Sequence, residues 1–230
     1  MIPLRDANPT RRPAIVMPAL IAACFLVFAG ELWLLTTGGD KALEDLANRW
    51  GLVPATLIGA VRAGDWLSQP VVAVFSSMFL HGGWAHILGN MLILWIFGRR
   101  VEDRAGRIGF LVLYLVGGLA AAAGQTLENP GSKLPMIGAS GAISAILGAY
   151  LVLYPKARIQ SLVFLGFFYQ LIAVPAAILL GYWFLLQVID GVAALGSTDL
   201  TGGVAVFAHI AGFLAGVVMG LTLRLRRSVG

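Results

Sequence analysis

The fold of this chain is decided by the stretch Met136-Ile137-Gly138-Ala139-Ser140-Gly141-Ala142-Ile143-Ser144-Ala145-Ile146-Leu147-Gly148-Ala149-Tyr150. No charge lies between Lys133 and Lys156, so a helix rising about 1.5 Å per residue would be long enough to cross a bilayer core of about 30 Å. Ser140 stands among glycines near the start of this run, where backbone N–H groups lack intrahelical partners. The pattern favours either a reactive serine or a plain packing ridge made by Gly138, Ser140, Gly141, Ser144 and Gly148.

The composition is that of an integral membrane protein. The 230 residues are 59% hydrophobic and 12% charged, with a mean hydropathy of +0.87, which excludes an ordinary soluble domain. The first apolar run follows Arg11 and Arg12 and continues to Gly30 without a cleavage site, so we expect a retained first helix. The single cysteine, Cys24, excludes an intramolecular disulfide and a cysteine metal cluster, and no cofactor or metal is expected.

Six charge-poor runs have about the length that a spanning helix needs. They cover residues 13–37, 80–98, 108–127, 134–155, 170–189 and 202–223. The sequence therefore predicts an all-α membrane protein with six transmembrane helices. We expect one polytopic membrane domain over 1–230, with a cytoplasmic N-terminal segment at 1–12, a core at 13–223 and a basic cytoplasmic tail at 224–230.

Basic residues are distributed unequally between alternate connections, which predicts the orientation in the membrane. Only four fall in one set: Lys41, Arg49, Arg62 and Lys133. The other set holds twelve: Arg5, Arg11, Arg12, Arg99, Arg100, Arg104, Arg107, Lys156, Arg158, Arg224, Arg226 and Arg227. Both termini are therefore expected in the cytoplasm, with connections 38–79 and 190–201 outside and Ser140 near the outer face. Because the basic residues are dispersed beside apolar segments, topology explains the net charge of +5 better than nucleic acid binding does.

The 38–79 connection is too long for a simple turn. Leu43, Leu46 and Trp50 recur at helical spacing, which indicates short amphipathic pieces in the membrane interface. We expect a partly embedded external subdomain between the first two helices. Pro70 argues that the piece before Ser76 is irregular, so that the second spanning helix begins near Gly82 or Gly83.

The second span carries two polar residues, His86 and Asn90, four apart on one helical face. Such side chains are costly inside a bilayer unless they face the protein interior or water, so we expect both to point inward. Their purpose is either functional or that of an interhelical hydrogen-bond clamp. His81, at the mouth of the span, is expected to be structural, and Glu102 in the charged turn after the span is expected to fix helix ends, with a neighbouring arginine as its possible partner.

The last span brings a histidine to a ridge of small residues. Gly212, Gly216 and Gly220 lie four apart, and His209 lies three residues before Gly212 on nearly the same face. Packing of this ridge against the Ser140 run would let the two backbones approach closely. We therefore expect His209 to reach Ser140, with Ser140, His86 and His209 each one to two turns into its span.

Three motifs together resemble the rhomboid family of intramembrane serine proteases: His86-Ile87-Leu88-Gly89-Asn90, Gly138-Ala139-Ser140-Gly141 and Ala208-His209-Ile210-Ala211-Gly212 with Gly216. The resemblance runs from about Phe79 to Gly220. It implies that Ser140 is the nucleophile and His209 the general base, and that His86, Asn90 and the Ser140 backbone N–H form the oxyanion hole. General chemistry agrees, since a serine needs an adjacent base and an oxyanion needs preorganised donors.

The same resemblance leaves open how His209 is oriented. The carboxylates Glu31, Asp190 and Asp199 lie outside the motifs and near span ends, so a Ser–His dyad is expected rather than a triad. Many family members place an aromatic residue four positions after the nucleophile, whereas this chain has Ser144. The Trp-Arg pair that many members carry in the external connection is also missing, and Val71-Val72-Ala73-Val74 stands in that region.

The resulting functional expectation is cleavage of transmembrane segments near the outer face of the membrane. Hydrolysis needs water, so we expect a polar cavity at Ser140, capped by the 190–201 loop. Substrates would be transmembrane proteins arriving from the lipid bilayer, and the location would be a bacterial plasma membrane. The alternatives are a catalytically weak or inactive relative that binds transmembrane clients, and a small transporter, although the sequence shows no internal repeat.

Overall fold

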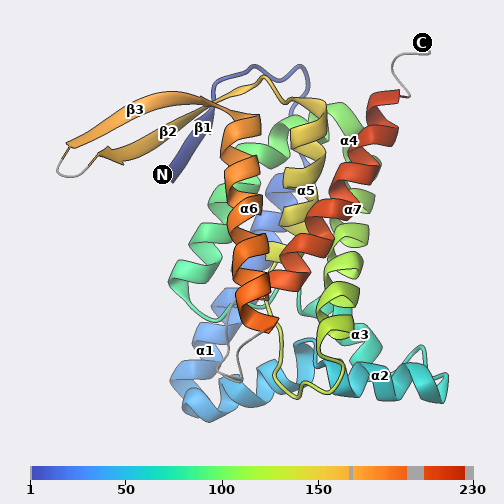
Figure 1. Ribbon diagram of the computed structural model, residues 1–230. Helices are drawn as coiled ribbons and strands as arrows, with labels where there is room; N and C mark the ends of the chain where they lie inside the picture. Colours follow the sequence, from blue (N-terminus) through green and yellow to red (C-terminus); the bar gives the residue numbers. More distant parts are fainter. Residues whose placement is uncertain (1, 166–167, 196–204, 226–230) are drawn as a thin grey trace.

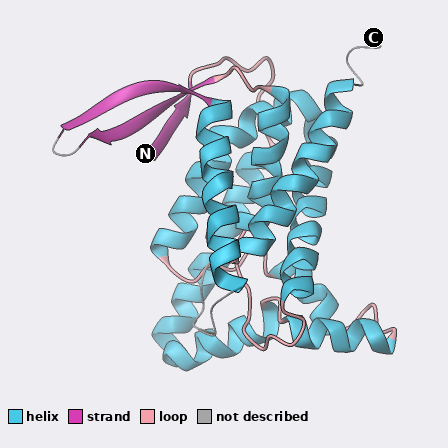
Figure 2. Cartoon of the chain, in the orientation of Figure 1, coloured by secondary structure: helices cyan, strands magenta, loops and turns pink. Residues whose placement is uncertain are grey.

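The computed structural model describes residues 2–165, 168–195 and 205–225, and within them the chain forms a helical bundle with a small sheet at one end (Figures 1 and 2). In chain order the elements are β1 (Ile2–Asp6), α1 (Val16–Trp50), α2 (Pro54–Ala63), α3 (Gln69–Ser76), α4 (Trp84–Glu128), α5 (Ser140–Leu153), β2 (Arg158–Leu165), β3 (Phe168–Pro175), α6 (Ala176–Leu195) and α7 (Val206–Leu225).

Two of these helices are broken by a glycine in a conformation that other residues rarely adopt. Gly39 in α1 has φ 68° and Gly106 in α4 has φ 74°. The break at Gly106 lets the two halves of α4 run in opposite directions through the bundle (Figure 1). The predicted second and third spans are therefore the two halves of α4, and the start of α4 at Trp84 agrees with the expected start near Gly82 or Gly83.

The helices have the apolar character of a membrane-embedded protein. Among the described residues, α1, α4 and α7 are long and apolar enough to cross a bilayer, and α5 and residues 176–192 of α6 are shorter apolar helices. The mainly helical membrane fold expected from composition is thus confirmed.

Helix α5 lies at the centre of the bundle and is buried on all sides from Gly141 to Tyr150. It packs on α4 and α7, and glycines bring α5 and α7 into backbone contact. A Cβ atom on Gly212 would overlap the carbonyl oxygen of Gly141, and one on Gly216 would overlap that of Ala145. The small-residue ridge of the last span therefore packs as its spacing predicts.

Residues 134–139 were expected to be part of a spanning helix, and they are not helical. Met136 pairs with Leu52 through two backbone hydrogen bonds of 2.8 and 2.9 Å, and the Gly138 N–H donates to the Ser77 carbonyl at 2.8 Å. Gly138 has φ 124°, which ends this extended segment just before α5. Ser140 is therefore the first residue of its helix rather than one to two turns inside it.

The three-stranded sheet was not expected either. Strand β2 pairs antiparallel with both β1 and β3, so the order is β1-β2-β3. The run 170–189, predicted as a spanning helix, begins with β3, and α6 starts only after Pro175. The reason is that a charge-free run indicates burial or lipid contact without choosing between strand and helix, and β-branched and aromatic residues in this run favour the strand.

Two buried carboxylates anchor helix ends and loops. Glu102 accepts the backbone N–H groups of Ile15, Val16 and Met17 at 2.8–2.9 Å, which caps the start of α1. The expected role of fixing a helix end is confirmed, although its partners are backbone groups. Glu31, placed near a span end by sequence, is buried and accepts the His81 backbone N–H at 3.0 Å.

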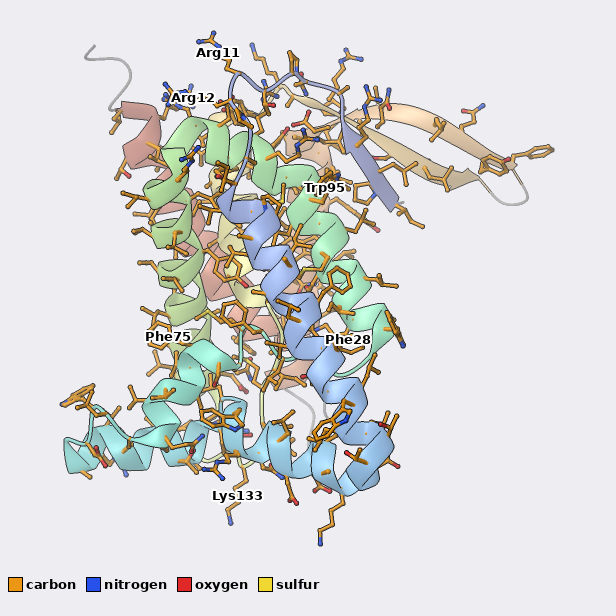
Figure 3. All side chains as sticks on the ribbon, turned by 180° about the vertical axis from the view of Figure 1, so that it is seen from behind. Arg11, Arg12, Phe28, Phe75, Trp95 and Lys133 are labelled. Atoms are coloured by element: carbon orange, nitrogen blue, oxygen red, sulfur yellow. The ribbon has the colours of Figure 1, made fainter. Side chains whose placement is uncertain are left out.

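The 38–79 connection forms helices, as its spacing indicates. The end of α1 with α2 and α3 lies across one end of the bundle, opposite the sheet (Figure 1). Figure 3 places Lys133 at that same end and Arg11 and Arg12 at the other. Trp66 is 63% exposed, so part of this connection has no cover from the protein itself.

Candidate active site

Two side chains from separate helices meet at the centre of the candidate site. The Ser140 hydroxyl oxygen lies 2.8 Å from Nε2 of His209, within hydrogen-bond distance. Ser140 begins α5 and His209 lies in the first turn of α7, and the close packing of these two helices brings the side chains together. The imidazole is 8% exposed, so the pair is largely shielded from solvent.

A third side chain, Gln187 of α6, holds the other nitrogen of the histidine. Its Oε1 lies 2.8 Å from Nδ1 of His209. An amide oxygen only accepts, so Nδ1 carries the proton and Nε2 keeps the lone pair that can accept the Ser140 proton. The sequence analysis missed Gln187, although it is a polar residue in an uncharged helix and such residues mark functional positions in membrane proteins.

An aromatic side chain also packs against the imidazole. The Trp183 ring centroid is 6.0 Å from that of His209, and Trp183 also contacts Phe213 on α7. Ser144 lies four positions after Ser140, where many rhomboid proteins have an aromatic residue. Its hydroxyl donates to the Ser140 carbonyl at 2.7 Å. Within the described residues, the His209 imidazole is therefore oriented by the hydrogen bond to Gln187 and by packing against Trp183.

His86 lines the same cavity as Ser140, and a backbone hydrogen bond defines its tautomer. Its Nδ1 accepts the Gly82 backbone N–H at 3.3 Å, so in the neutral ring Nε2 carries the proton. That Nε2 is directed at Gly138, where an added Cβ would lie 2.6 Å away. Gly138 therefore leaves the space that lets a His86 donor stand beside the start of α5.

Asn90, one turn further along α4, directs its amide at the same place. Its Nδ2 lies 3.7 Å from where a Gly138 Cβ would be, and within the described part of the chain this buried nitrogen has no hydrogen-bond partner. A buried donor without an acceptor is costly, so Asn90 could donate to an acceptor that enters the cavity. The Ser140 backbone N–H, at the first residue of α5, has no intrahelical partner position either.

A cavity of about 950 Å³ contains the four predicted site residues Ser140, His209, His86 and Asn90. Its remaining wall is largely apolar and includes Phe97, Leu147, Leu179 and Trp183. The cavity extends along the bundle as far as Pro3 of β1. The cavity is therefore mainly apolar, with a small polar centre.

The other residues considered from sequence lie outside this centre. His81 is buried, its Nδ1 donates to the Phe79 carbonyl at 3.0 Å, and burial lowers the pKa of His81 to about 4. This structural role agrees with the expectation. Asp190 is exposed in α6, which continues to Leu195, so the expected 190–201 loop begins later than predicted. Asp199 and the rest of that loop lie outside the described residues.

The chain is similar in sequence to proteins of one known family. A family model described as Rhomboid domain matches residues 68–226, which include all four site residues and Gln187. Rhomboid protease GluP of Bacillus subtilis is 32% identical over 191 residues, covering 82% of this chain and 32% of that protein. RHOMBOID-like protein 5 of Arabidopsis thaliana is 28% identical over 172 residues, covering 65% of this chain and 56% of that protein.

A mitochondrial relative matches a shorter part. Rhomboid protein 1, mitochondrial, of Saccharomyces cerevisiae is 32% identical over 97 residues, covering 40% of this chain and 28% of that protein. In each of these three matches the chain spans little more than half of the relative's length, or less.

Proposed function

Because the chain belongs to the rhomboid family, we propose that it is an intramembrane serine endopeptidase that cleaves transmembrane segments of membrane proteins through a Ser140/His209 dyad. The observation that carries the proposal is the continuous hydrogen-bonded series from Gln187 through His209 to Ser140, with both distances at 2.8 Å. A hydroxyl is a weak nucleophile at neutral pH, and an imidazole lone pair within hydrogen-bond reach is what activates it.

The acylation step follows from these positions. As Ser140 Oγ bonds to the carbonyl carbon of the scissile peptide, its proton passes to Nε2 of His209. The carbonyl oxygen becomes an oxyanion, for which we assign the His86 Nε2–H, the Asn90 amide and the Ser140 backbone N–H as donors. By analogy with soluble proteases, one such donor contributes about 3–4 kcal/mol to the transition state.

The leaving amine then takes the proton from Nε2, which leaves an acyl-enzyme on Ser140. A water molecule in the cavity gives its proton to the same Nε2 and attacks the ester carbon, and the proton returns to Ser140 Oγ as the acid product leaves. Gln187 keeps Nδ1 protonated throughout, so that one tautomer serves both halves of the reaction. The reaction as written uses no cofactor or metal.

We further propose a six-span topology for one domain over 1–230, with residues 1–12 and 224–230 in the cytoplasm and a core at 13–223. The 38–79 and 190–201 connections would then be external, the former partly embedded. In this assignment the sheet is at the cytoplasmic end, which is also where the basic residues gather. The proposed location is a bacterial plasma membrane, and the proposed partners are the bilayer and transmembrane protein substrates rather than nucleic acid.

The substrate proposal rests on the form of the cavity. A peptide bond inside a helix has its carbonyl hydrogen-bonded, so a spanning segment must unwind before Ser140 can attack it. Cleavage should therefore favour segments with Gly, Ala, Ser or Pro near their outer ends, among which Gly and Pro most reduce the stability of the helix. The apolar wall of the cavity would hold the flanking residues of such a segment.

Labelling with a fluorophosphonate probe tests the proposed nucleophile. The detergent-solubilised protein should be modified at Ser140, and His209→Ala should strongly reduce the labelling. Labelling that is equal in wild type and Ser140→Ala would contradict the assignment. Two other functions differ in their outcome: an inactive client-binding protein would resist the probe, and a transporter would move a solute across liposomes without cleaving peptides.

A further inference from the structure

We propose that four arginines at the sheet end of the bundle, Arg11, Arg12, Arg100 and Arg104, form a binding site for a phosphate group. These residues line a cavity of about 410 Å³ together with Asp103 and Tyr154. We call it the arginine cavity. It lies at the opposite end of the molecule from α2 and α3, and Figure 3 shows Arg11 and Arg12 there, beside the turn of α4.

The carboxylates at this end do not balance the arginines. Asp103 directs its two oxygens at the backbone N–H groups of Arg11 and Arg12, each at 3.0 Å. Glu102 is occupied by three backbone N–H groups at the start of α1. These bonds hold the segment that carries Arg11 and Arg12 against α4 while leaving both guanidinium charges at the rim of the cavity.

Arg100 provides the strongest indication of a missing ligand. Its Nη1 is buried and forms an ion pair with Oδ2 of Asp6 at 3.9 Å, but it has no hydrogen-bond partner among the described residues. The same Asp6 oxygen accepts the Tyr150 hydroxyl at 2.6 Å. The guanidinium is held flat by the Tyr154 ring, whose centroid lies 4.0 Å from Cζ. A fixed donor with an unmet hydrogen bond is a preorganised anion site.

The group that fits is phosphate rather than carboxylate. Guanidinium forks bind phosphate oxygens in pairs, and a phosphate group presents more oxygens than a carboxylate to several guanidiniums at once. Arg104 gives one donor to the Leu223 carbonyl at 2.8 Å and has others in its fork. The cavity volume is more than ten times the roughly 30 Å³ of one water, so it has room for a phosphate ester as well as the bare ion.

The surroundings favour a phospholipid as the source of that phosphate. A second cavity of about 390 Å³ shares Arg100 and Pro9 with the first, and is bordered by Leu4, Trp95 and Ile96. Arg99 stacks on Trp95 at 5.2 Å, and Trp95 is 49% exposed on the surface of a membrane-embedded helix. Apolar and aromatic groups beside a cluster of guanidiniums match the junction between a lipid headgroup and its acyl chains.

Lipid binding to the full-length protein in detergent provides the test. Native mass spectrometry would count adducts during titration with dioctanoyl phosphatidylglycerol, with dioctanoylglycerol, which has the same acyl chains and no phosphate, as the comparison and inorganic phosphate as a competitor. We expect one preferred phosphatidylglycerol site. Arg12→Gln and Arg100→Gln should each weaken it about tenfold or more, the size of one lost charged hydrogen bond.

Arg107→Gln is the matched control, because Arg107 lies at the same end of the molecule and lines neither cavity. It removes the same charge and should leave the affinity unchanged. If Arg100→Gln does not fold, Arg12→Gln carries the test alone, because Arg12 is exposed. An equal loss in Arg107→Gln would indicate diffuse attraction and overturn the proposal, as would equal binding of dioctanoylglycerol, which has no phosphate.

The competitor distinguishes the two sources of phosphate. Inorganic phosphate that occupies the site only at high concentration would support a lipid headgroup as the ligand. Tight binding of inorganic phosphate that is lost in Arg12→Gln, with no added effect of the lipid, would support the phosphate site and identify the free ion as its ligand. Absence of binding by both would overturn the proposal.

Discussion

Gln187 Oε1 and His209 Nδ1 lie 2.8 Å apart, and the bond joins α6 to α7 on the side of the imidazole that faces away from Ser140. In soluble serine proteases a buried carboxylate holds the histidine. Here a neutral amide stands in that position. It fixes the same tautomer without placing an uncompensated charge in a membrane-embedded helix bundle, where an ionised group would be expensive.

Removal of the amide should impair chemistry more than folding. We expect Gln187→Ala to lower kcat by up to about 100-fold, since an imidazole free to rotate loses its alignment with Ser140, while KM changes little. Gln187→Glu keeps an acceptor at Nδ1 and should retain more activity than the alanine variant. Steady-state kinetics on a model transmembrane substrate would check this, and equal kcat values for wild type and Gln187→Ala would show that the bond has no catalytic role.

The dyad should behave as one unit. Ser140→Ala and His209→Ala are each expected to abolish proteolysis, and the double variant should be little worse than either single one, because each substitution already disables the same step. Cleavage assays and thermal melting on all three proteins would measure this. The proposed mechanism would be contradicted if the activity losses of the two single variants multiplied in the double variant, or if folded Ser140→Ala kept substantial turnover.

The donors on α4 should affect the transition state. We expect His86→Ala or Asn90→Ala to lower kcat by roughly 10- to 1000-fold with little change in KM or melting temperature. If the two side chains instead clamp helices together, stability should fall by about 0.6–2 kcal/mol while the folded protein cleaves normally. Parallel measurement of kcat and unfolding separates these outcomes.

Substitution of Glu102 should lower stability and leave kcat unchanged, the reverse of what we expect for His86 and Asn90. Its carboxylate satisfies three N–H groups at the start of α1, so Glu102→Ala should lower the free energy of unfolding by about 1–3 kcal/mol. The folded fraction should keep its kcat, because Glu102 lies close to the break of α4 at Gly106, sixteen residues after His86 and so about 24 Å further along the helix. Glu102→Gln, which keeps one acceptor oxygen, should fall between wild type and alanine. A loss of kcat without a loss of stability would contradict this structural role.

The orientation in the membrane gives a further test. A topology reporter fused after Gly230 should be active only in the cytoplasm, and one inserted near Gly39 only outside. The reason is the excess of basic residues at the sheet end of the bundle. The same fusions to a variant lacking the Ser140 hydroxyl would check that cleavage does not produce the result. A reporter with external activity after Gly230 would reverse the proposed topology.

The sequence was sufficient for the parts of this molecule that depend on periodicity and motif order. The glycines spaced four apart in α7 predicted its contact with α5, and the polar residues within apolar runs led to His86, Asn90 and His209. Gln187 was missed because a lone amide has no periodicity, and only the packing of α6 on α7 gives it a partner.

The sheet and the start of α5 were missed for another reason. Residues 134–139 and 168–175 are uncharged, and their hydropathy is compatible with a helix, a strand or an extended segment. Met136 is held by Leu52, a partner far away in the chain, and this pairing leaves no local signal in the sequence. Strand β3 pairs with β2, the strand directly before it, but hydropathy alone does not distinguish this hairpin from the start of a helix.

The three residues of the hydrogen-bonded series come from three different helices, and this has a consequence for the timing of turnover. A displacement of α6 by about 1 Å would stretch the Gln187 bond beyond hydrogen-bond length and release the imidazole, even with Ser140 and His209 in place. Under the proposed mechanism, any substrate that enters by pushing α6 aside must therefore wait until α6 returns before its peptide bond can be broken. Entry and bond cleavage then become consecutive events, and a segment that wedges α6 outward would occupy the protein without being cut.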